Sequence, residues 1–335
     1  MTEAIETRWL TRRDMDCKTI SYAQNGEDVL IDRVFGRDHA GLYVDVGAND
    51  PVFHSVTNLL YQNGWRGVNI EPTPSLHRRL ELDRPEDANL NVGISDAEGV
   101  LTFYEVAPPL HGWSTFVPEI AESYRELDVF PKPRPIAVTT LSTIFAEHVG
   151  DQTVDVLKVD AEGFERQVLA GLDWSRWRPR LVLIEATWSD SWESILFGAG
   201  YLKAAFDGIN NYYVREEDRA FLPRFTAPVN NADQYISHEV VRLVDSLDER
   251  FGPIALAVAR FLRDASKRHR GLAEAVKRLM RMARGDFRAR PREDLAKVAN
   301  LLGCTRFDEA QSPARRASAS PKRSTVTPTR SMSER

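Results

Sequence analysis

Two acids stand at the ends of short apolar segments, where the chain then turns. Asp45 lies in the segment "YVDV" ahead of Gly47, and Glu71 follows "GVNI", 24 positions after Gly47. The stretch between them has the periodicity of a helix over residues 55–65. A carboxylate placed in this way pairs with a cation or accepts hydrogen bonds from hydroxyl groups. Asp45 and Glu71 therefore predict a ligand that carries both features.

The loop after Asp45 argues against a dinucleotide as that ligand. Dinucleotide loops carry GxGxxG, with a helix N-terminus facing the pyrophosphate. Here Gly47 is the only such glycine, Pro51 stands where many loops have a third one, and Asp45 would repel a pyrophosphate. S-adenosylmethionine has no phosphate and carries an ammonium and a sulfonium. We expect Asp45 to face its ammonium and Glu71 its ribose hydroxyls, with a turn cap and a solvated strand end as the simpler alternatives.

A third strand, expected over residues 88–96, ends in Ser95 and Asp96. Because ligands of an open α/β sheet bind outside the carboxyl ends of its strands, this end is expected to face the adenine. Asp96 would accept a hydrogen bond from the exocyclic amine. The segment "SDAEG" is also typical of an ordinary turn.

Later carboxylates and one histidine are candidates for proton removal. A hydroxyl that accepts a methyl group must lose its proton, so a general base or a metal ion assists. Asp160 closes the fourth predicted strand, Glu185 closes the fifth, and His54 follows the first loop. We expect Asp160 to be the base, then His54, which can instead be a packed helix-start residue. Asp160 and Glu162 also suit Mg²⁺, but the spacing offers no third ligand, so a divalent cation is the less favoured alternative.

Polar and aromatic side chains in two loops predict the acceptor site. Trp113 and Ser114 lie in the irregular stretch "PPLHGWSTF", and Trp188 follows the fifth strand. Asp207 and Asn210 lie in a predicted hairpin turn. An aromatic face beside polar groups suits a sugar, whereas loop tryptophans can also simply cover the core.

The elements that must position these residues alternate along the first two thirds of the chain. Strand-like apolar runs follow helical patterns, which predicts an α/β fold with a Rossmann-like, doubly wound, mainly parallel sheet. An antiparallel hairpin over residues 203–216, turning at 207–210, is expected at its C-terminal edge. After about residue 240 the pattern is helical only. The earlier strands are expected at 41–47, 66–72, 88–96, 99–106, 154–165 and 180–187, and the first helix at 20–36.

Charge and composition divide the chain of 335 residues. Its net charge is −5, but residues 259–292 carry 12 Lys/Arg against 3 Asp/Glu, so the first 258 residues are strongly acidic. An acidic body argues against nucleic acid as a ligand. We expect a methyl-transfer domain at 1–240, a basic helical extension at 241–310 and a disordered basic tail at 311–335. The basic segment 259–292 can contact an anionic membrane surface, a protein partner, a polyanionic glycan or the acidic body itself.

Targeting signals and cysteine use predict the compartment. The first 20 residues have no apolar core run, and no stretch reaches the roughly 18–20 apolar residues of a membrane helix. The two cysteines, Cys17 and Cys304, are far apart and neither lies in a CxxC motif. A cytoplasmic protein without disulfides or a zinc site is therefore expected.

Several motifs in this order resemble the FkbM-type methyltransferase family. The resemblance implies a Rossmann-like fold and O-methylation from S-adenosylmethionine, often of a sugar hydroxyl, with Asp45, Gly47, Asn49, Glu71 and Asp96 at the cofactor. It also implies that the helix carrying Gln24 lies across the cofactor as a lid. Pro51 departs from the glycine of many relatives and is expected to begin a helix. The motifs are "YAQNGEDVLI", "DVGANDPVFHSVT", "GWRGVNIEPTP", "NVGISDAEG", "LKVDAEGFE" and "LIEAT", and "FDGINNYYV" is similar to a branch associated with surface polysaccharides.

These observations predict an S-adenosylmethionine-dependent O-methyltransferase acting on a sugar of a surface polysaccharide or its precursor. Methylation of a secondary-metabolite hydroxyl is the nearest alternative. A different class of function is a non-catalytic module that binds the cofactor and docks polysaccharide enzymes through its basic helices. The sequence does not specify the oligomeric state.

Overall fold

The computed structural model describes residues 18–185, 192–243, 245 and 246. The predicted basic extension therefore lies outside the described residues except at its first few positions, and so do the basic tail, Trp188, Cys17 and Cys304. In the described part, no helix has both the length and the apolar character needed to cross a membrane.

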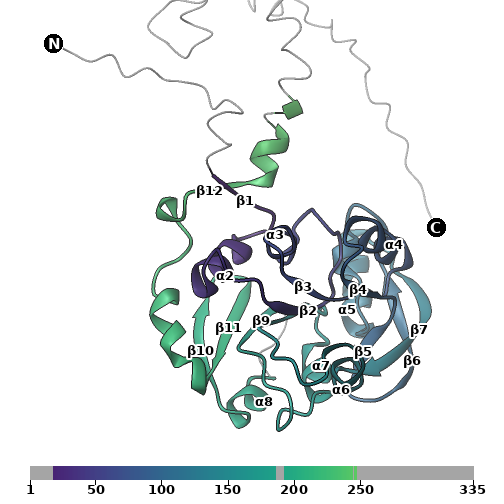
Figure 1. Cartoon of the computed structure of the whole chain (residues 1–335). Coiled ribbons are helices and arrows are strands. Elements are labelled where there is room, and N and C mark those ends of the chain that lie inside the picture. Colours follow the sequence, from purple (N-terminus) through teal and green to yellow (C-terminus); the bar gives the residue numbers. More distant parts are fainter. Residues whose placement is uncertain (1–17, 186–191, 244, 247–335) are drawn as a thin grey trace, which may run out of the picture. The chain divides into compact units, whose positions relative to one another are not determined.

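A seven-stranded sheet forms the centre of the described domain (Figure 1). Five of its strands are parallel, and the last two in the sequence form an antiparallel hairpin at one edge. Their Val, Leu and Ile side chains are buried on both faces, as parallel strands require. The spatial order is β10 (Tyr201–Phe206), β11 (Asn210–Arg215), β9 (Leu181–Glu185), β8 (Val156–Val159), β2 (Leu42–Val46), β3 (Arg66–Ile70) and β4 (Ala88–Leu90).

The strand order reverses between β2 and β8. Chain order runs outward from β2 to β4 on one side and from β8 to β9 on the other. In open α/β sheets a ligand crevice lies outside the carboxyl ends of the strands at such a switch point. The predicted fold class, including the hairpin turning at 207–210, is confirmed.

Helices cover both faces of this sheet, as Figure 1 shows. One apolar core joins the sheet to α6, α7 and α8, and a second joins the other face to α2 and α3. These two cores fix which side chains of each strand point to which face, because side chains alternate along a strand. The helices are α2 (Glu27–Phe35), α3 (Asn58–Gln62), α4 (Pro74–Asp83), α5 (Pro118–Ser123), α6 (Leu141–Ile144), α7 (Glu165–Ala170) and α8 (Glu193–Gly198).

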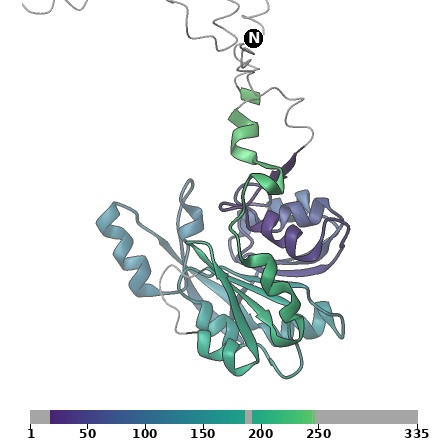
Figure 2. The same ribbon diagram turned by 90° about the vertical axis from the view of Figure 1, so that its left-hand side faces the viewer.

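A separate three-stranded sheet contradicts two of the expected strands. The strand expected at 88–96 is broken: β4 pairs in the central sheet, whereas β5 (Gly93–Ser95) pairs with β7 (Lys132–Thr140). The strand expected at 99–106 on the far side of the central sheet is β6 (Gly99–Glu105), which pairs with β7 of this second sheet and not with a strand of the central sheet. Between β6 and β7, the α5 segment extends away from the central sheet (Figure 2).

The first predicted helix is shorter than expected. Its first residues form β1 (Thr19–Ser21), which pairs with β12 (Tyr235–Ser237), and α2 begins only at Glu27. Pro51 does not begin a helix either, because α3 starts at Asn58. Asp50 instead caps a turn and accepts hydrogen bonds from the N–H groups of Val52 and Phe53. The shorter connecting elements are η1 (His111–Trp113), η2 (Tyr124–Leu127), η3 (Phe145–Val149), η4 (Glu216–Phe225) and η5 (Asn231–Asp233).

Candidate functional site

A cleft opens at the carboxyl ends of β2, β3 and β8, at the switch point. It contains about 580 Å³ of empty volume, part of which is open solvent. Its floor is apolar, and its walls carry polar groups from three different loops. The floor includes Val46, Ile70, Ile94 and Val168, and the walls include Gly47, Asn49, Glu71, His111, Ser114, Asp160 and Glu162.

Gly47 allows the loops after β2 and β8 to meet at this cleft. Its φ of 73° lies in the left-handed region, and a Cβ there would lie 1.9 Å from the backbone oxygen of Asp160. Only glycine fits both conditions. The next left-handed residue is Asn49, with a φ of 53°, so the loop turns twice within three residues. This geometry brings the candidate cofactor loop and the candidate base together.

Glu71 lies at the end of β3 with its carboxylate in the cleft wall. One carboxylate oxygen accepts from the N–H of Asn49 at 2.9 Å and the other from the N–H of Thr73 at 2.7 Å. Burial raises the pKa of Glu71, while these N–H groups and the Lys158 ammonium oppose that rise. The carboxylate thus fixes the cofactor loop and still offers acceptor capacity to the cleft.

The polar atoms of the cleft fit S-adenosylmethionine. Within the described residues, Asn49 Oδ1 and His111 Nδ1 are buried and have no hydrogen-bond partner. Both residues line the cleft next to Glu71. Acceptors around an apolar floor match hydroxyl, amine and ammonium groups and would repel phosphates. These groups of the cleft therefore fit a cationic nucleoside with free hydroxyls.

Asp45 is placed differently from the sequence expectation. It is buried, 1% exposed, and it does not line the cleft. Its Oδ2 accepts from the Thr57 hydroxyl at 2.7 Å, and its Oδ1 lies 3.2 Å from the ammonium of Lys158. Because Asp45 pairs with Lys158 across β2 and β8, its side chain lies on the sheet face that α2 covers. In place of the expected contact with the ammonium of a cofactor, direct or through water, Asp45 forms an internal ion pair with Lys158.

Lys158 is a buried lysine that sequence reasoning missed. Its ammonium donates to the Gly47 carbonyl at 2.7 Å and lies 3.3 Å from Asp160 Oδ2. Burial lowers the pKa of Lys158, but the carboxylates of Asp45 and Asp160 outweigh this and raise it overall. The lysine therefore stays charged. The signal in the sequence is a single lysine inside the apolar run "VLKV".

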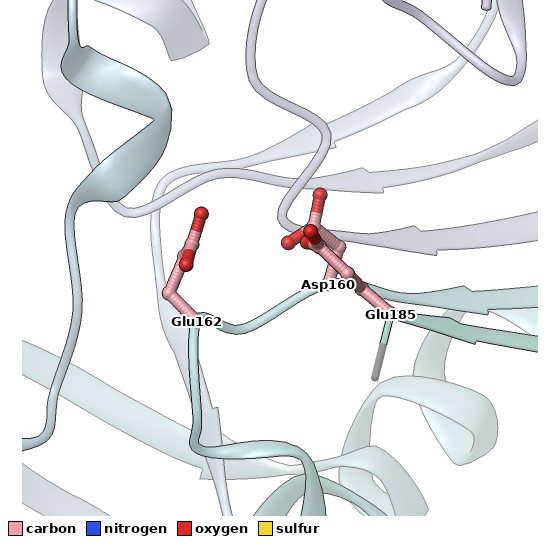
Figure 3. Close-up of side chains that lie close together, drawn as sticks. All are labelled: Asp160, Glu162 and Glu185. Atoms are coloured by element: carbon pink, nitrogen blue, oxygen red, sulfur yellow. The ribbon is translucent and has the colours of Figure 1, made fainter. Parts of the chain in front are cut away.

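Three carboxylates converge beside the cleft (Figure 3). Asp160, Glu162 and Glu185 each place one oxygen within 4.8 Å of the others, and all three side chains are partly exposed. Asp160 and Glu162 lie in the loop after β8, and Glu185 is the last residue of β9. The spacing of the sequence did not reveal Glu185 as the third member, because adjacent parallel strands bring it there. Such a group can take up a proton, and its oxygens are of the type that Mg²⁺ prefers.

The segment between β6 and α5 lies over the cleft. Gly112 packs against the side-chain amide of Asn49, and the Thr115 hydroxyl donates to the Glu162 carbonyl at 2.7 Å. Ser114 lines the cleft, with its hydroxyl bound to the N–H of Val106 and to the carbonyl of His111. This segment, rather than the residues around Gln24, covers the cofactor loop.

Trp113 and Gln24 lie outside the cleft. The ring of Trp113 packs on Tyr124 at a centroid distance of 5.3 Å, so its expected sugar contact is not with the cleft itself. Gln24 is exposed and precedes the start of α2. The helix that was expected to be a lid is α2. It packs instead on the sheet face opposite the one that α6 and α7 cover.

The hairpin residues belong to a buried polar network near Glu185. Asn210 is the pairing partner of Glu185 between β11 and β9, and its amide donates to Glu27 Oε1 at 2.9 Å. Asp207 accepts from the Asn210 N–H and from the Tyr212 hydroxyl. Burial raises the pKa of Glu27 to about 7. Asp207 and Asn210 thus join α2 to the strand end that carries Glu185.

Three further candidates lie away from the cleft. His54 is exposed, with Nε2 2.9 Å from Glu239 Oε1 and its ring stacked on Phe53. Ser95 is buried at the end of β5 and donates to Asp96, which is exposed. Because the third strand is split, the cleft wall beside β4 is formed by residues 92–94 instead. The expected adenine contact of Asp96 therefore has no geometric support.

Comparison with known proteins gives the family. Residues 45–221, more than half of the chain, match the Methyltransferase FkbM domain. The chain is 29% identical over 176 residues to methyltransferase sdnD of Sordaria araneosa, covering 44% of this chain and 66% of that protein.

Two solved structures are also similar. Methyltransferase FkbM from Methylobacillus flagellatus KT aligns with 16% identity and a TM-score of 0.31, over 52% of this chain and 43% of that one. A TehB-like SAM-dependent methyltransferase from Corynebacterium glutamicum aligns with 13% identity and a TM-score of 0.32, over 57% and 87%. On the strength of the domain match, the chain belongs to the FkbM methyltransferase family.

Proposed function

We propose that this protein is an S-adenosylmethionine-dependent O-methyltransferase that acts on a sugar hydroxyl of a surface polysaccharide or its precursor. The observation that carries the proposal is the position of Glu71. It lines the cleft at the switch point together with Asp160, and its carboxylate accepts from the N–H of Asn49, two residues after Gly47. An acid in that wall suits ribose hydroxyls and disfavours the phosphates of other nucleotide cofactors.

Different residues of the cleft would contact different parts of the cofactor. Glu71 would accept from the ribose hydroxyls, and Asn49 and His111 would supply the buried polar atoms that lack partners within the described residues. The apolar floor would contact the adenine and exclude water. S-adenosylmethionine, when bound, supplies an electrophilic methyl group. The chain itself must then bring an acceptor oxygen close to that methyl and in line with it.

Asp160 is the proposed general base. It lies at the cleft and is partly exposed, so an acceptor hydroxyl can reach its carboxylate. Its carboxylate would take the hydroxyl proton as the new bond to oxygen forms. Glu162 and Glu185 each place a carboxylate oxygen within 4.8 Å of one of Asp160, and they would orient the neighbouring hydroxyls of a sugar.

The sugar acceptor rests on two supports. The carboxyl edge of the sheet carries carboxylate and amide groups from β8, β9 and the hairpin, which suit a polyhydroxylated acceptor. The hairpin motif "FDGINNYYV" is similar to the branch of the family associated with surface polysaccharides. A cytoplasmic location is part of the proposal, since the two isolated cysteines suit a reducing compartment.

Two experiments test this function in sequence. Calorimetric titration with S-adenosylhomocysteine should show binding at one site per chain, and absence of binding would overturn the cofactor assignment. Labelled S-adenosylmethionine is then screened against sugar nucleotides, glycolipids and phenolic secondary metabolites. Label in a sugar fraction supports the proposal. Label in the phenols alone would contradict the sugar acceptor and support methylation of a secondary-metabolite hydroxyl.

The same screen tests the role of the three carboxylates. It is run with EDTA and with added Mg²⁺, on the wild type and on Glu185→Gln. A rate that EDTA abolishes and Mg²⁺ restores would show that Asp160, Glu162 and Glu185 act through a cation rather than with Asp160 as a free base. Binding of S-adenosylhomocysteine without transfer to any acceptor would favour the non-catalytic module.

A further inference from the structure

We propose that Lys158 is a positioning residue that ties the cofactor loop to the candidate base, with Asp45 as its buried counter-ion. Its ammonium would hold the Gly47 carbonyl and the Asp160 carboxylate in a single arrangement. This inference rests on the proposed function and adds to it the residue that couples the two halves of the site.

Three contacts of one ammonium carry the inference. Lys158 Nζ donates to the Gly47 carbonyl at 2.7 Å and lies 3.2 Å from Asp45 Oδ1 and 3.3 Å from Asp160 Oδ2. The hydrogen bond to Gly47 and the ion pairs with two carboxylates place the ammonium at the junction of the cofactor loop and the candidate base. Within the described residues Asp45 Oδ1 accepts no hydrogen bond, so its contact with Lys158 is an ion pair. The Lys158 side chain is only 9% exposed, so these groups are its main polar surroundings.

The position of Lys158 is fixed from the side of Asp45. Register places Asp45 directly beside Lys158 on the neighbouring strand, and Asp45 Oδ2 is held by the Thr57 hydroxyl. That hydroxyl accepts in turn from the buried guanidinium of Arg84 at 2.6 Å. Arg84 also donates to the Pro51 carbonyl, so the chain of contacts begins and ends on the cofactor loop. These contacts hold the Lys158 ammonium in place from the side of Asp45. The ammonium can therefore fix the positions of Gly47 and Asp160 on its other side.

The charges of the junction also favour this role. Lys158 neutralises one of its two carboxylate neighbours, so the trio with Asp45 and Asp160 keeps a net charge of −1. Asp45 is 1% exposed, whereas the side chain of Asp160 is 32% exposed and lines the cleft. The remaining negative charge is therefore presented at the cleft, where a sulfonium and an acceptor hydroxyl would meet. Without Lys158, two carboxylates would repel each other below the cofactor loop.

The first test uses S-adenosylhomocysteine as the probe and needs no acceptor. Lys158→Met keeps the length of the side chain and removes the charge and the donors. We expect its affinity for S-adenosylhomocysteine to fall about tenfold at unchanged stoichiometry, as loss of one hydrogen bond from a charged group would give. Affinity within threefold of the wild type would overturn the proposal, and so would reduced stoichiometry at wild-type affinity, because that marks a misfolded fraction.

Matched variants separate positioning from packing. Lys203→Met removes a lysine that pairs with Glu193 at 2.7 Å on β10, and it should bind like the wild type. Lys158→Arg keeps the charge and the donors and should bind more tightly than Lys158→Met. Equal losses in the arginine and methionine variants would show that shape alone matters and would contradict the proposal.

A double variant covers the case in which Lys158→Met does not fold. Asp45→Asn/Lys158→Met removes both buried charges, and such neutral replacements of buried pairs are tolerated better than the loss of one partner. It should unfold cooperatively and show the same tenfold loss of affinity. If this folded variant binds S-adenosylhomocysteine like the wild type, the proposal is wrong.

The link to the base is tested with the acceptor found in the screen. Lys158→Met should lower kcat about 10²-fold through misplacement of Asp160, and it should lower kcat no further when Asp160→Asn is already present. Independent losses that multiply would contradict a role through Asp160. A wild type that fails to bind S-adenosylhomocysteine overturns the proposed function, whereas a wild type that binds and an equally tight Lys158→Met overturn this inference alone.

Discussion

The two faces of the central sheet hold their polar groups in different ways at the carboxyl edge. On the cleft side, main-chain N–H groups donate to two buried acids, Glu71 and Glu165, around an apolar floor. On the side that α2 covers, buried charged groups contact one another, as Lys158 does with Asp45. The cleft side is therefore organised by backbone geometry and the other side by charge balance.

This difference predicts which changes each side tolerates. A backbone turn such as that at Gly47 is insensitive to pH but does not accept a side chain. A buried ionisable group is sensitive to pH, because burial is the largest cause of a shift in its pKa: the pKa of Glu27 rises to about 7 and that of Asp28 to about 6. Asp160 lines the cleft and also pairs with Lys158. Its position should therefore depend both on the backbone turn at Gly47 and on the charge balance around Lys158.

The largest effect is expected at Asp160. Asp160→Asn removes the proposed base and should lower kcat about 10²- to 10⁴-fold, with S-adenosylhomocysteine affinity within a few-fold of the wild type. Steady-state kinetics and calorimetry check this together. Asp151→Asn, on a fully exposed side chain, is the control and should match the wild type. Equal activity of the two variants would mean that the base lies elsewhere.

The next effect is expected on the cleft side. Glu71→Ala removes the acceptor for ribose hydroxyls and releases the N–H groups of Asn49 and Thr73, so S-adenosylhomocysteine affinity should fall about 100-fold. Calorimetric titration measures it. Glu81→Ala, which removes an exposed acid paired with Arg78 on α4, serves as the control. Unchanged binding by Glu71→Ala would remove the distinction between the two faces.

A pH effect on stability is expected at Glu27 on the α2 side. Glu27 has a pKa of about 7 in the folded protein against 4.5 when unfolded, so its neutral form is favoured by folding. Its contribution to the free energy of unfolding is fully present below about pH 4.5 and is lost as pH rises to 7, by roughly 3 kcal/mol. Urea denaturation of the wild type and Glu27→Gln at several pH values should show their stability difference shifting in favour of the variant as pH rises.

An exposed acid provides the comparison for Glu27. Glu119 lies in the first turn of α5 and is exposed, so Glu119→Gln is the control that removes a carboxyl group at the surface instead of a buried one. A stability difference for Glu27→Gln that does not change with pH would show that Glu27 is ionised in the folded protein over this range. The charge balance of the α2 side would then need a different account.

The smallest effects are expected at two residues that lie on neither side of the junction. His54 is exposed and contacts Glu239, and Asp96 is exposed beyond β5. Because exposed ion pairs contribute about 0–1 kcal/mol, His54→Ala and Asp96→Asn should each change cofactor affinity and kcat less than threefold. A tenfold loss in either variant would restore that residue to the site.

The sequence predicted the cleft side better than the α2 side for a physical reason. Gly47, Glu71 and Asp160 lie at strand ends, and parallel strands of an open sheet present those ends at one edge whatever the details of packing. Their convergence therefore follows from the order of the elements. Asp96 failed this rule because β4 ends early and β5 joins another sheet, and no local pattern marks such a break.

What the sequence determined by itself is the alternation of strands and helices, the family, and the acids and glycine at the ends of the strands. Only the tertiary structure decided which face of the sheet each acid points to. Asp45 and Glu71 look alike in the sequence, yet register puts Asp45 beside Lys158, while Glu71 follows its strand into the cleft. Likewise Glu185 joins Asp160 only through pairing of β8 with β9. Contacts across strands depend on register, which a single sequence does not contain, whereas strand ends are marked by the local pattern.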